Sequence, residues 1–149
     1  MSQFGTSTAN VSTSVVSGGA VASAPRWRLW AGWAISALPI LGLLMSAGMK
    51  ITHPPDVMKM FTEHLGYSAS VLPMLAALEI TCIVLYAIPQ TAVLGAILVS
   101  GYLGGAIATH VRVGESFAAP LAMAVLAWAG LYLREPRLHV LVPLRRLRE

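Results

Sequence analysis

Charged residues are scarce in this sequence of 149 residues. Asp, Glu, Lys and Arg together make up 11% of it and hydrophobic residues 56%, whereas about a quarter of an ordinary soluble domain is charged. A soluble fold needs more charged surface than this. The net charge of +4 comes mostly from arginines near the ends. Because no basic face interleaved with aromatic residues is present, a nucleic-acid partner is not expected.

Cysteine is almost absent as well. The single cysteine, Cys82, lies inside an apolar run. One thiol excludes an intrachain disulfide framework, a CxxC redox centre and a structural zinc site made of several cysteines. We therefore expect Cys82 to be a small side chain that faces lipid or the interior of a helix bundle.

The sequence has long apolar runs instead. Each is close to the roughly 20 residues that a helix needs to cross a bilayer, and they span residues 27–49, 71–88, 91–109 and 117–133. They do not alternate polar and apolar residues as the strands of a membrane barrel do, and a helix satisfies its own backbone groups in lipid. The pattern predicts an all-α fold, an integral membrane four-helix bundle.

Three segments are expected along the chain. Residues 1–24 contain no Lys, Arg, Asp or Glu, so residues 1–25 are interpreted as a disordered tail. Residues 26–141 form the four-helix transmembrane domain, and residues 142–149 form a basic cytoplasmic tail. In the loop after the first run, Pro55 suits a helix start and Gly66 a helix end, which predicts a short amphipathic helix at the membrane interface.

The distribution of Lys and Arg predicts the orientation. Cytoplasmic loops of membrane proteins carry an excess of these residues. With four crossings, three basic residues fall on one side of the membrane and seven on the other. The three are Lys50, Lys59 and Arg112, and the seven are Arg26, Arg28, Arg134, Arg137, Arg145, Arg146 and Arg148. We therefore expect a multi-pass protein of the cell membrane with both termini in the cytoplasm.

Glu79 is the polar residue that most needs an explanation. It lies several turns inside the second run, where a carboxylate costs about 2.5 kcal/mol or more. One interpretation is a hydrogen-bonded glutamate that locks two helices together. The other is a group that binds a proton or a ligand. Counting back from the turn at Pro89 brings Glu79 level with Ser100 and Tyr102, either of which could donate to it. Tyr102 itself is interpreted as an interior phenol or, less simply, as a catalytic acid.

The third run contains small residues at helical spacing. Gly101 and Gly105 form a GxxxG pair, and Gly95 and Gly104 add to the small-residue surface. Because lipid provides no hydrophobic drive between helices, small residues favour association by letting backbones approach. We expect these four glycines to pack the third helix tightly against its neighbours.

Histidines gather on the predicted outer side without a metal-binding pattern. His53, His64 and His110 fall there beside Arg112, but no HxxxH or HExxH pair joins them. A haem held between helices needs paired intramembrane histidines. His139 cannot pair with His110, because the two are predicted on opposite sides of the membrane. The sequence therefore predicts no metal site and no cofactor, and it shows no positive sign of an enzyme.

Several short blocks together resemble the DoxX-like family. They are LAALE at 75–79, IPQT at 88–91, LGAIL at 94–98, GYLGGAIATHVR at 101–112 and, in the first loop, FTEHLGY at 61–67. The resemblance covers roughly residues 28–141. It implies a small four-helix membrane protein of bacteria or archaea. Glu79, Gly104, Gly105, His110 and Arg112 match the family's pattern, and no role follows for any of them from the match.

The family takes its name from a subunit of a terminal quinol oxidase and thiosulfate:quinone oxidoreductase system. The resemblance therefore implies a non-catalytic, accessory subunit of a quinone-linked membrane redox assembly. Its partners would be the lipid bilayer together with other redox subunits or a second copy of the chain. The alternative is a small proton-coupled transporter that uses Glu79. A third hypothesis is an oxidoreductase acting on a quinol or a thiol, against which the lone Cys82 and the missing ligand pairs argue.

Overall fold

The protein is described by a computed structural model that covers residues 26–141. The tails predicted for residues 1–25 and 142–149 lie outside the described residues. All regular elements of the described part are helical, which confirms the all-α prediction. In chain order they are α1 (Arg26–Thr52), α2 (Pro55–Lys59), the π-helical turn η1 (Met60–His64), the 3-10 turn η2 (Ala69–Val71), α3 (Leu72–Ala87), α4 (Ala92–Arg112), α5 (Ala118–Arg134) and α6 (Leu138–Leu141).

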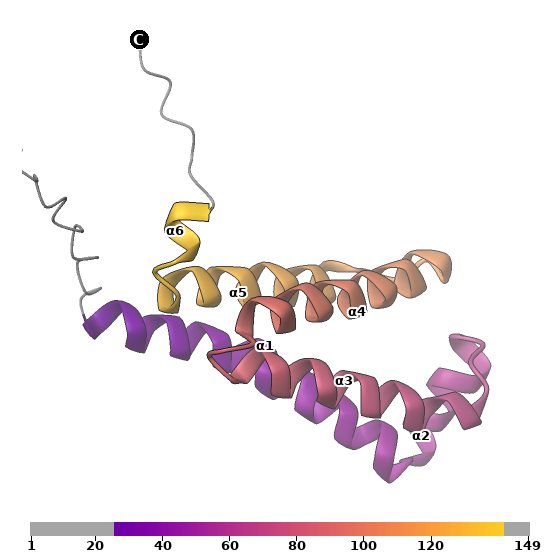
Figure 1. Cartoon of the computed structure of the whole chain (residues 1–149). Coiled ribbons are helices and arrows are strands. Elements are labelled where there is room, and N and C mark those ends of the chain that lie inside the picture. Colours follow the sequence, from indigo (N-terminus) through magenta and orange to yellow (C-terminus); the bar gives the residue numbers. More distant parts are fainter. Residues whose placement is uncertain (1–25, 142–149) are drawn as a thin grey trace, which may run out of the picture.

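The four long helices form an up-and-down bundle (Figure 1). Helix α1 packs against α3 and α5, and α4 packs against the same two helices. The order around the bundle is therefore α1, α3, α4, α5. The end of the bundle where α1 stops and α3 starts lies beside the short helix α2, and we call it the α2 end. The opposite end lies beside α6, and we call it the α6 end. In Figure 1 the α4–α5 pair leans away from the α1–α3 pair toward the α2 end.

Three helical segments are long and apolar enough to cross a membrane: Arg26–Thr52, Ala69–Ala87 and Ala92–Arg112. Helix α5 is also apolar but has 17 residues, at the lower end of the usual range of about 17–25. Large apolar side chains point away from the bundle; Trp30 is 78% exposed and Leu41 63%. An apolar surface of this extent needs a lipid solvent.

The first long loop contains the short helix that the sequence predicts. It begins at Pro55, in the first turn, where the missing N–H of proline costs nothing. It continues through η1, and Gly66 follows with φ +68°, a backbone conformation that favours glycine. Leu65 is buried against the bundle and the opposite side of the segment is exposed. The predicted amphipathic helix is confirmed, and its second half is a wider π-helical turn.

Backbones approach closely near the α6 end. A Cβ added to Gly95 of α4 would lie 2.2 Å from the Tyr86 nitrogen of α3. A Cβ added to Gly130 of α5 would lie 2.8 Å from the Ser36 nitrogen of α1. Only glycine fits at such distances, so these two positions determine how tightly the helices join at this end.

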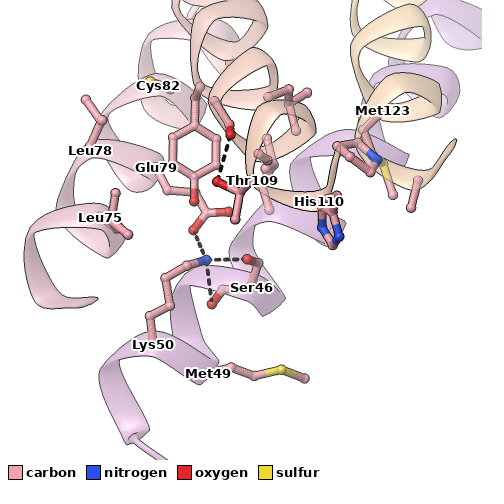
Figure 2. Close-up of a pocket in the computed structure, with 18 of the residues that line it drawn as sticks. Ser46, Met49, Lys50, Leu75, Leu78, Glu79, Cys82, Thr109, His110 and Met123 are labelled. Carbon is pink, nitrogen blue, oxygen red and sulfur yellow. Dashed lines mark hydrogen bonds and ion pairs between the residues drawn. The ribbon is translucent and has the colours of Figure 1, made fainter. Parts of the chain in front are cut away.

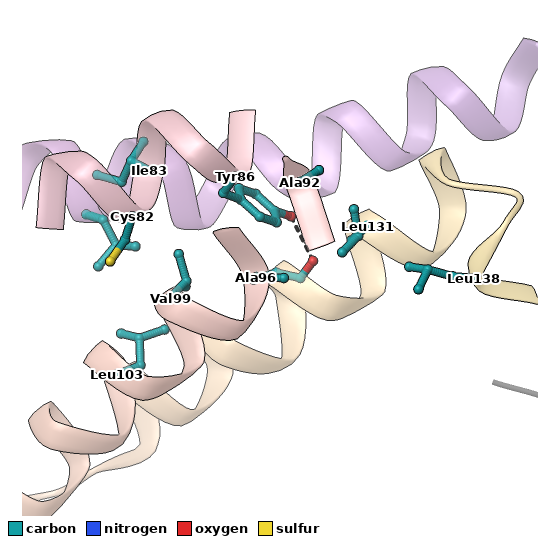
Figure 3. Packing of buried hydrophobic residues seen from close by; sticks show 11 residues of the cluster. Cys82, Ile83, Tyr86, Ala92, Ala96, Val99, Leu103, Leu131 and Leu138 are labelled. Carbon is teal, nitrogen blue, oxygen red and sulfur yellow. Dashed lines mark hydrogen bonds between the residues drawn. The ribbon is translucent and has the colours of Figure 1, made fainter. Parts of the chain in front are cut away.

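Tyr86 connects three helices in the same region. Its hydroxyl donates to the Ala127 carbonyl of α5 (2.7 Å) and accepts a hydrogen bond from Ser36 Oγ of α1 (2.9 Å). Arg134 donates to the Tyr86 carbonyl, and its guanidinium carbon lies 4.6 Å from the centre of the Tyr86 ring. Figure 3 shows the ring among the buried side chains of α3, α4 and α5. The α6 end is thus held by apolar packing and by one fully paired phenol.

Tyr86→Phe should lower the free energy of unfolding by about 1–3 kcal/mol, because it removes two buried hydrogen bonds and keeps the ring. Tyr132→Phe is the matched control, since the Tyr132 side chain is 40% exposed and its hydroxyl makes no hydrogen bond in residues 26–141. The control should change stability little. Unfolding by sodium dodecyl sulfate in mixed micelles, followed by circular dichroism, measures both; equal effects would contradict the assigned role of the Tyr86 hydroxyl.

Candidate functional site

A buried ion pair joins α1 to α3. Lys50 Nζ lies 2.9 Å from Glu79 Oε2, and the two side chains are 5% and 0% exposed. Lys50 stands in the last turn of α1. Its side chain points back along the helix, as helical side chains do, and also donates to Ser46 Oγ one turn earlier. Figure 2 shows the ammonium group between the serine and the carboxylate.

Of the two residues expected to donate to Glu79, Tyr102 lies beside the carboxyl group and Ser100 bonds elsewhere. Ser100 donates to the Ala96 carbonyl and accepts a hydrogen bond from Trp128 Nε1 on α5 (2.8 Å). Tyr102 lies beside the Glu79 carboxyl group, and the centre of its ring is 6.0 Å from the Lys50 ammonium nitrogen. Counting residues from the turn considered only the α3–α4 hairpin. Glu79 also reaches α1, and its ion pair with Lys50 could not be found from that hairpin.

The second carboxylate oxygen of the pair, Glu79 Oε1, has no hydrogen-bond partner in the described part of the chain. Buried oxygens of this kind usually have one. The three donors of the Lys50 ammonium group go to Glu79 Oε2, Ser46 Oγ and the Ser46 carbonyl. The site can therefore accept one further hydrogen-bond donor.

A cavity of about 890 Å³ lies beside the ion pair, at the α2 end. All four long helices and the α2–η1 segment contribute to its wall, which is mostly apolar. Figure 2 shows Leu75, Leu78 and Met123 together with the ion pair around this space. The polar residues of the wall are Ser46, Lys50, Tyr67, Glu79, Tyr102, Thr109 and His110. The cavity thus combines an apolar body with a polar patch.

The predicted packing glycines divide into two groups. Gly95 is in close contact with the backbone of α3. Gly101, Gly104 and Gly105 are exposed, and a Cβ added to any of them would meet no atom within 4 Å. The expectation of tight packing is therefore wrong for these three within one chain. Helix α4 diverges from its neighbours toward the α2 end, and Gly101 and Gly105 line the cavity instead.

His110 and Arg112 belong to a polar cluster at the α2 end. His110 Nδ1 lies 2.9 Å from Glu115 Oε2, and His64 Nε2 of η1 lies 2.8 Å from Glu115 Oε1. Arg112 donates to the Leu65 carbonyl. Hydrogen bonds from His110 and then His64 hold the pKa of the Glu115 carboxyl group below its usual value.

Glu115 was missed by the sequence analysis. Helix α4 ends at Arg112, and Gly114 follows with φ +74°. This turn folds the chain back, so that the Glu115 amide donates to the His110 carbonyl (2.9 Å). The available signal was a glycine after a helix with a carboxylate directly behind it, which places that carboxylate beside the last helical turn.

Titratable side chains of the described residues do not form a metal site. Within residues 26–141, no group of three or more His, Cys, Asp or Glu side chains could hold a metal ion. Cys82 is buried, 2% exposed, in the wall of the cavity. His53 is exposed in the loop after α1.

The model of the DoxX-like family matches residues 34–130, about two thirds of the chain. The chain belongs to the DoxX-like family. No curated protein and no solved structure is significantly similar to it. Together with the apolar helices, the family match makes it a multi-pass membrane protein with three candidate spans.

The matched range of this DoxX-like protein contains the whole candidate site. Lys50 and Glu79, the glycines of the cavity wall, and the polar cluster of His64, His110 and Glu115 all lie between residues 34 and 130. The α6 end is only partly included, since Arg134 follows the last matched residue. The family match by itself assigns no role to any of these residues.

Proposed function

We propose that this DoxX-like protein is a non-catalytic subunit of a quinone-linked membrane redox assembly, and that it holds a quinol-type molecule in its cavity. The cavity beside the Lys50–Glu79 pair carries this proposal. Its volume of about 890 Å³ is in the range of small-molecule sites, roughly 300–1,000 Å³. A molecule with a small polar ring and an apolar tail suits a wall that is apolar except for one patch.

The chemistry of the polar patch supports a ligand with a hydroxyl group. Lys50 already donates to Ser46 and Glu79, so its contribution is to hold the carboxylate in place. Glu79 Oε1 is left to accept a hydrogen bond. A quinol hydroxyl is a donor, whereas a quinone carbonyl is not. The reduced form should therefore bind more tightly than the oxidised form.

An accessory role follows from what the chain can contribute chemically. Within the described residues the site offers one buried thiol and no group of metal-ligating side chains. A protein with these side chains can bind and position a quinol, while the redox centres that carry the electrons would belong to a partner subunit. Copurification from a gentle detergent extract, with mass spectrometry, should therefore return the chain together with redox subunits. Recovery of the chain alone under several extraction conditions would contradict this.

The proposal includes four crossings with both termini in the cytoplasm. Helix α5 packs along α1, and at about 1.5 Å per residue its 17 residues extend roughly 26 Å, close to the hydrocarbon thickness. The α2 end would then face outward, with three of the ten Lys and Arg residues. Labelling of single cysteines at each end in intact cells would test this orientation.

Gly105→Leu should abolish most of the binding, because a Cβ at this position has open space and the rest of the side chain would take up part of the cavity. Gly104→Leu is the matched control, since Gly104 is equally exposed on the same helix but is not part of the cavity wall. An azido-benzoquinol photolabel, the reduced form that the site should prefer, measures occupancy in lipid nanodiscs with peptide mapping. We expect labelling of the cavity wall to fall about tenfold in Gly105→Leu and to persist in Gly104→Leu. Equal labelling of the two variants, or none of the wild type, would contradict the proposal.

The alternative, a small proton-coupled transporter, is favoured by one observation. Glu79 is a buried carboxylate in the wall of the cavity, where proton uptake could be coupled to ligand movement. Proton-driven flux of a cationic substrate in reconstituted vesicles, lost in Glu79→Gln with unchanged expression, would support transport. Unchanged flux in that variant would remove the alternative.

A further inference from the structure

A set of polar contacts bridges the α2 end of the bundle. On one side lie His64, Leu65 and Tyr67, which follow α2. On the other lie residues at the end of α4 and in the loop after it: Thr109, His110, Arg112 and Glu115. We call these seven residues the clasp. Tyr67 donates to Thr109 Oγ1 (2.7 Å), because the Thr109 hydroxyl itself donates to the Gly105 carbonyl.

Glu115 is the centre of the clasp. One carboxylate oxygen lies 2.8 Å from His64 Nε2 of η1, and the other lies 2.9 Å from His110 Nδ1 of α4. The three side chains are 51%, 39% and 31% exposed for His64, Glu115 and His110. They are thus open to protons from the surrounding water. Two imidazoles and one carboxylate form a bridge whose charge changes with pH.

The clasp is placed to control the width of the cavity. Leu65 and Tyr67 on one side and Thr109 and His110 on the other all line it. Helices α3 and α4 are in close backbone contact near the α6 end, at Gly95, whereas α4 offers open space around Gly101 and Gly105 toward the α2 end. Polar contacts therefore replace close helix packing where the cavity opens.

The geometry points to a proton-sensitive clasp that holds the cavity closed in mild acid and loosens it above neutral pH. This rests on the proposed function only where it names the cavity as the ligand site. A protonated imidazole is attracted to Glu115 by its full charge, whereas a neutral imidazole keeps only a hydrogen bond to the carboxylate. Histidine is the side chain that most often serves as a switch near neutral pH, so mildly acidic and mildly basic buffers are the conditions to compare.

The charged groups around Glu115 determine the sign of the effect. His64 faces it from η1 and His110 from α4, and these are the two groups whose charge acts on it. Arg112, on the same side of the clasp, bonds the Leu65 carbonyl and keeps its charge throughout. The lowered pKa of Glu115 keeps the carboxylate ionised in mild acid. The contribution of Glu115 is lost only when the pH falls through that lowered value, well below the range in which histidine titrates.

Electron–electron distance measurements on spin-labelled protein test the clasp without any ligand. Labels at Lys59→Cys and Ser116→Cys, both exposed positions, in a Cys82→Ala background report the separation of its two sides in nanodiscs. We expect a shorter and narrower distance distribution at pH 5.5 than at pH 8. His64–Glu115 is the partly exposed ion pair that joins the two sides, and it should change the ratio of closed to open molecules about two- to fivefold.

Two variants make the test specific. Glu115→Gln, which keeps the shape and removes the charge, should give the broad distribution at both pH values. Glu63→Gln removes a carboxylate from the residue before His64 and should keep the response of the wild type. The same distribution at pH 5.5 and pH 8 in the wild type, or an unchanged response in Glu115→Gln, would overturn the clasp. Photolabelling of the cavity would be unaffected by that result, so failure of the clasp and failure of the proposed function are distinguishable.

Discussion

Lys50→Met should lower the free energy of unfolding by about 3–5 kcal/mol, because it leaves a buried carboxylate without its cation. Glu79 is completely buried, and its second oxygen already has no partner in the described residues. Glu79→Leu should cost a comparable amount, since it leaves the Lys50 charge inside the bundle.

The double variant Lys50→Met, Glu79→Leu should recover most of the loss, to within about 1 kcal/mol of the wild type, because two apolar side chains of similar volume replace two compensating charges. Lys59→Met is the matched control: Lys59 is exposed on α2, so the same chemical change should be nearly neutral. Detergent-induced unfolding of the four proteins gives the coupling energy. Additive losses in the double variant would show that the two charges do not stabilise one another.

Gly95→Ala should destabilise the bundle by about 3 kcal/mol or more, at the upper end of overpacking effects. The added Cβ would lie 2.2 Å from the Tyr86 nitrogen and 2.3 Å from its Cα. These are backbone atoms inside a helix, so no rotamer change relieves the clash. Helices α3 and α4 would have to separate, and the packing around Tyr86 would be lost with them.

Gly104→Ala, on the same helix, should have the opposite sign. A Cβ at Gly104 meets nothing within 4 Å, and alanine is favoured over glycine inside a helix by about 0.5–1 kcal/mol. Unfolding of both variants in the same detergent system measures the difference. If the two substitutions changed stability equally, close packing of α3 against α4 at Gly95 would be contradicted.

These predictions reflect a difference between the two ends of the bundle. The α6 end is held by close backbone contacts and by Tyr86, which leaves little freedom to move. The α2 end has a cavity, a buried ion pair in its wall and polar contacts that join two parts of that wall. Ligand sites need elements of lower local stability, because a ligand must enter and leave. The α2 end is therefore where function is proposed.

Composition and apolar periodicity were sufficient to predict the helices. Long runs with almost no charge and no alternation of polar and apolar residues must be helical in lipid, and helix ends follow from prolines, glycines and polar residues. Pro55 and Gly66 therefore located the short helix of the first loop correctly. The importance of Glu79 also followed from the sequence alone, because a carboxylate inside an apolar run is costly wherever it points.

The partners of these residues depended on the tertiary structure. Which side of α3 faces α1 is decided by how the helices rotate against one another, and depth along one hairpin carries no information about rotation. Lys50 was counted among the charges of the outer side. Its position in the sequence does not reveal that its long side chain reaches back into the bundle. The glycines of α4 show the same limit. Small residues permit close approach, but only the splay of the helices decided that Gly95 is packed and that Gly101 and Gly105 border a cavity.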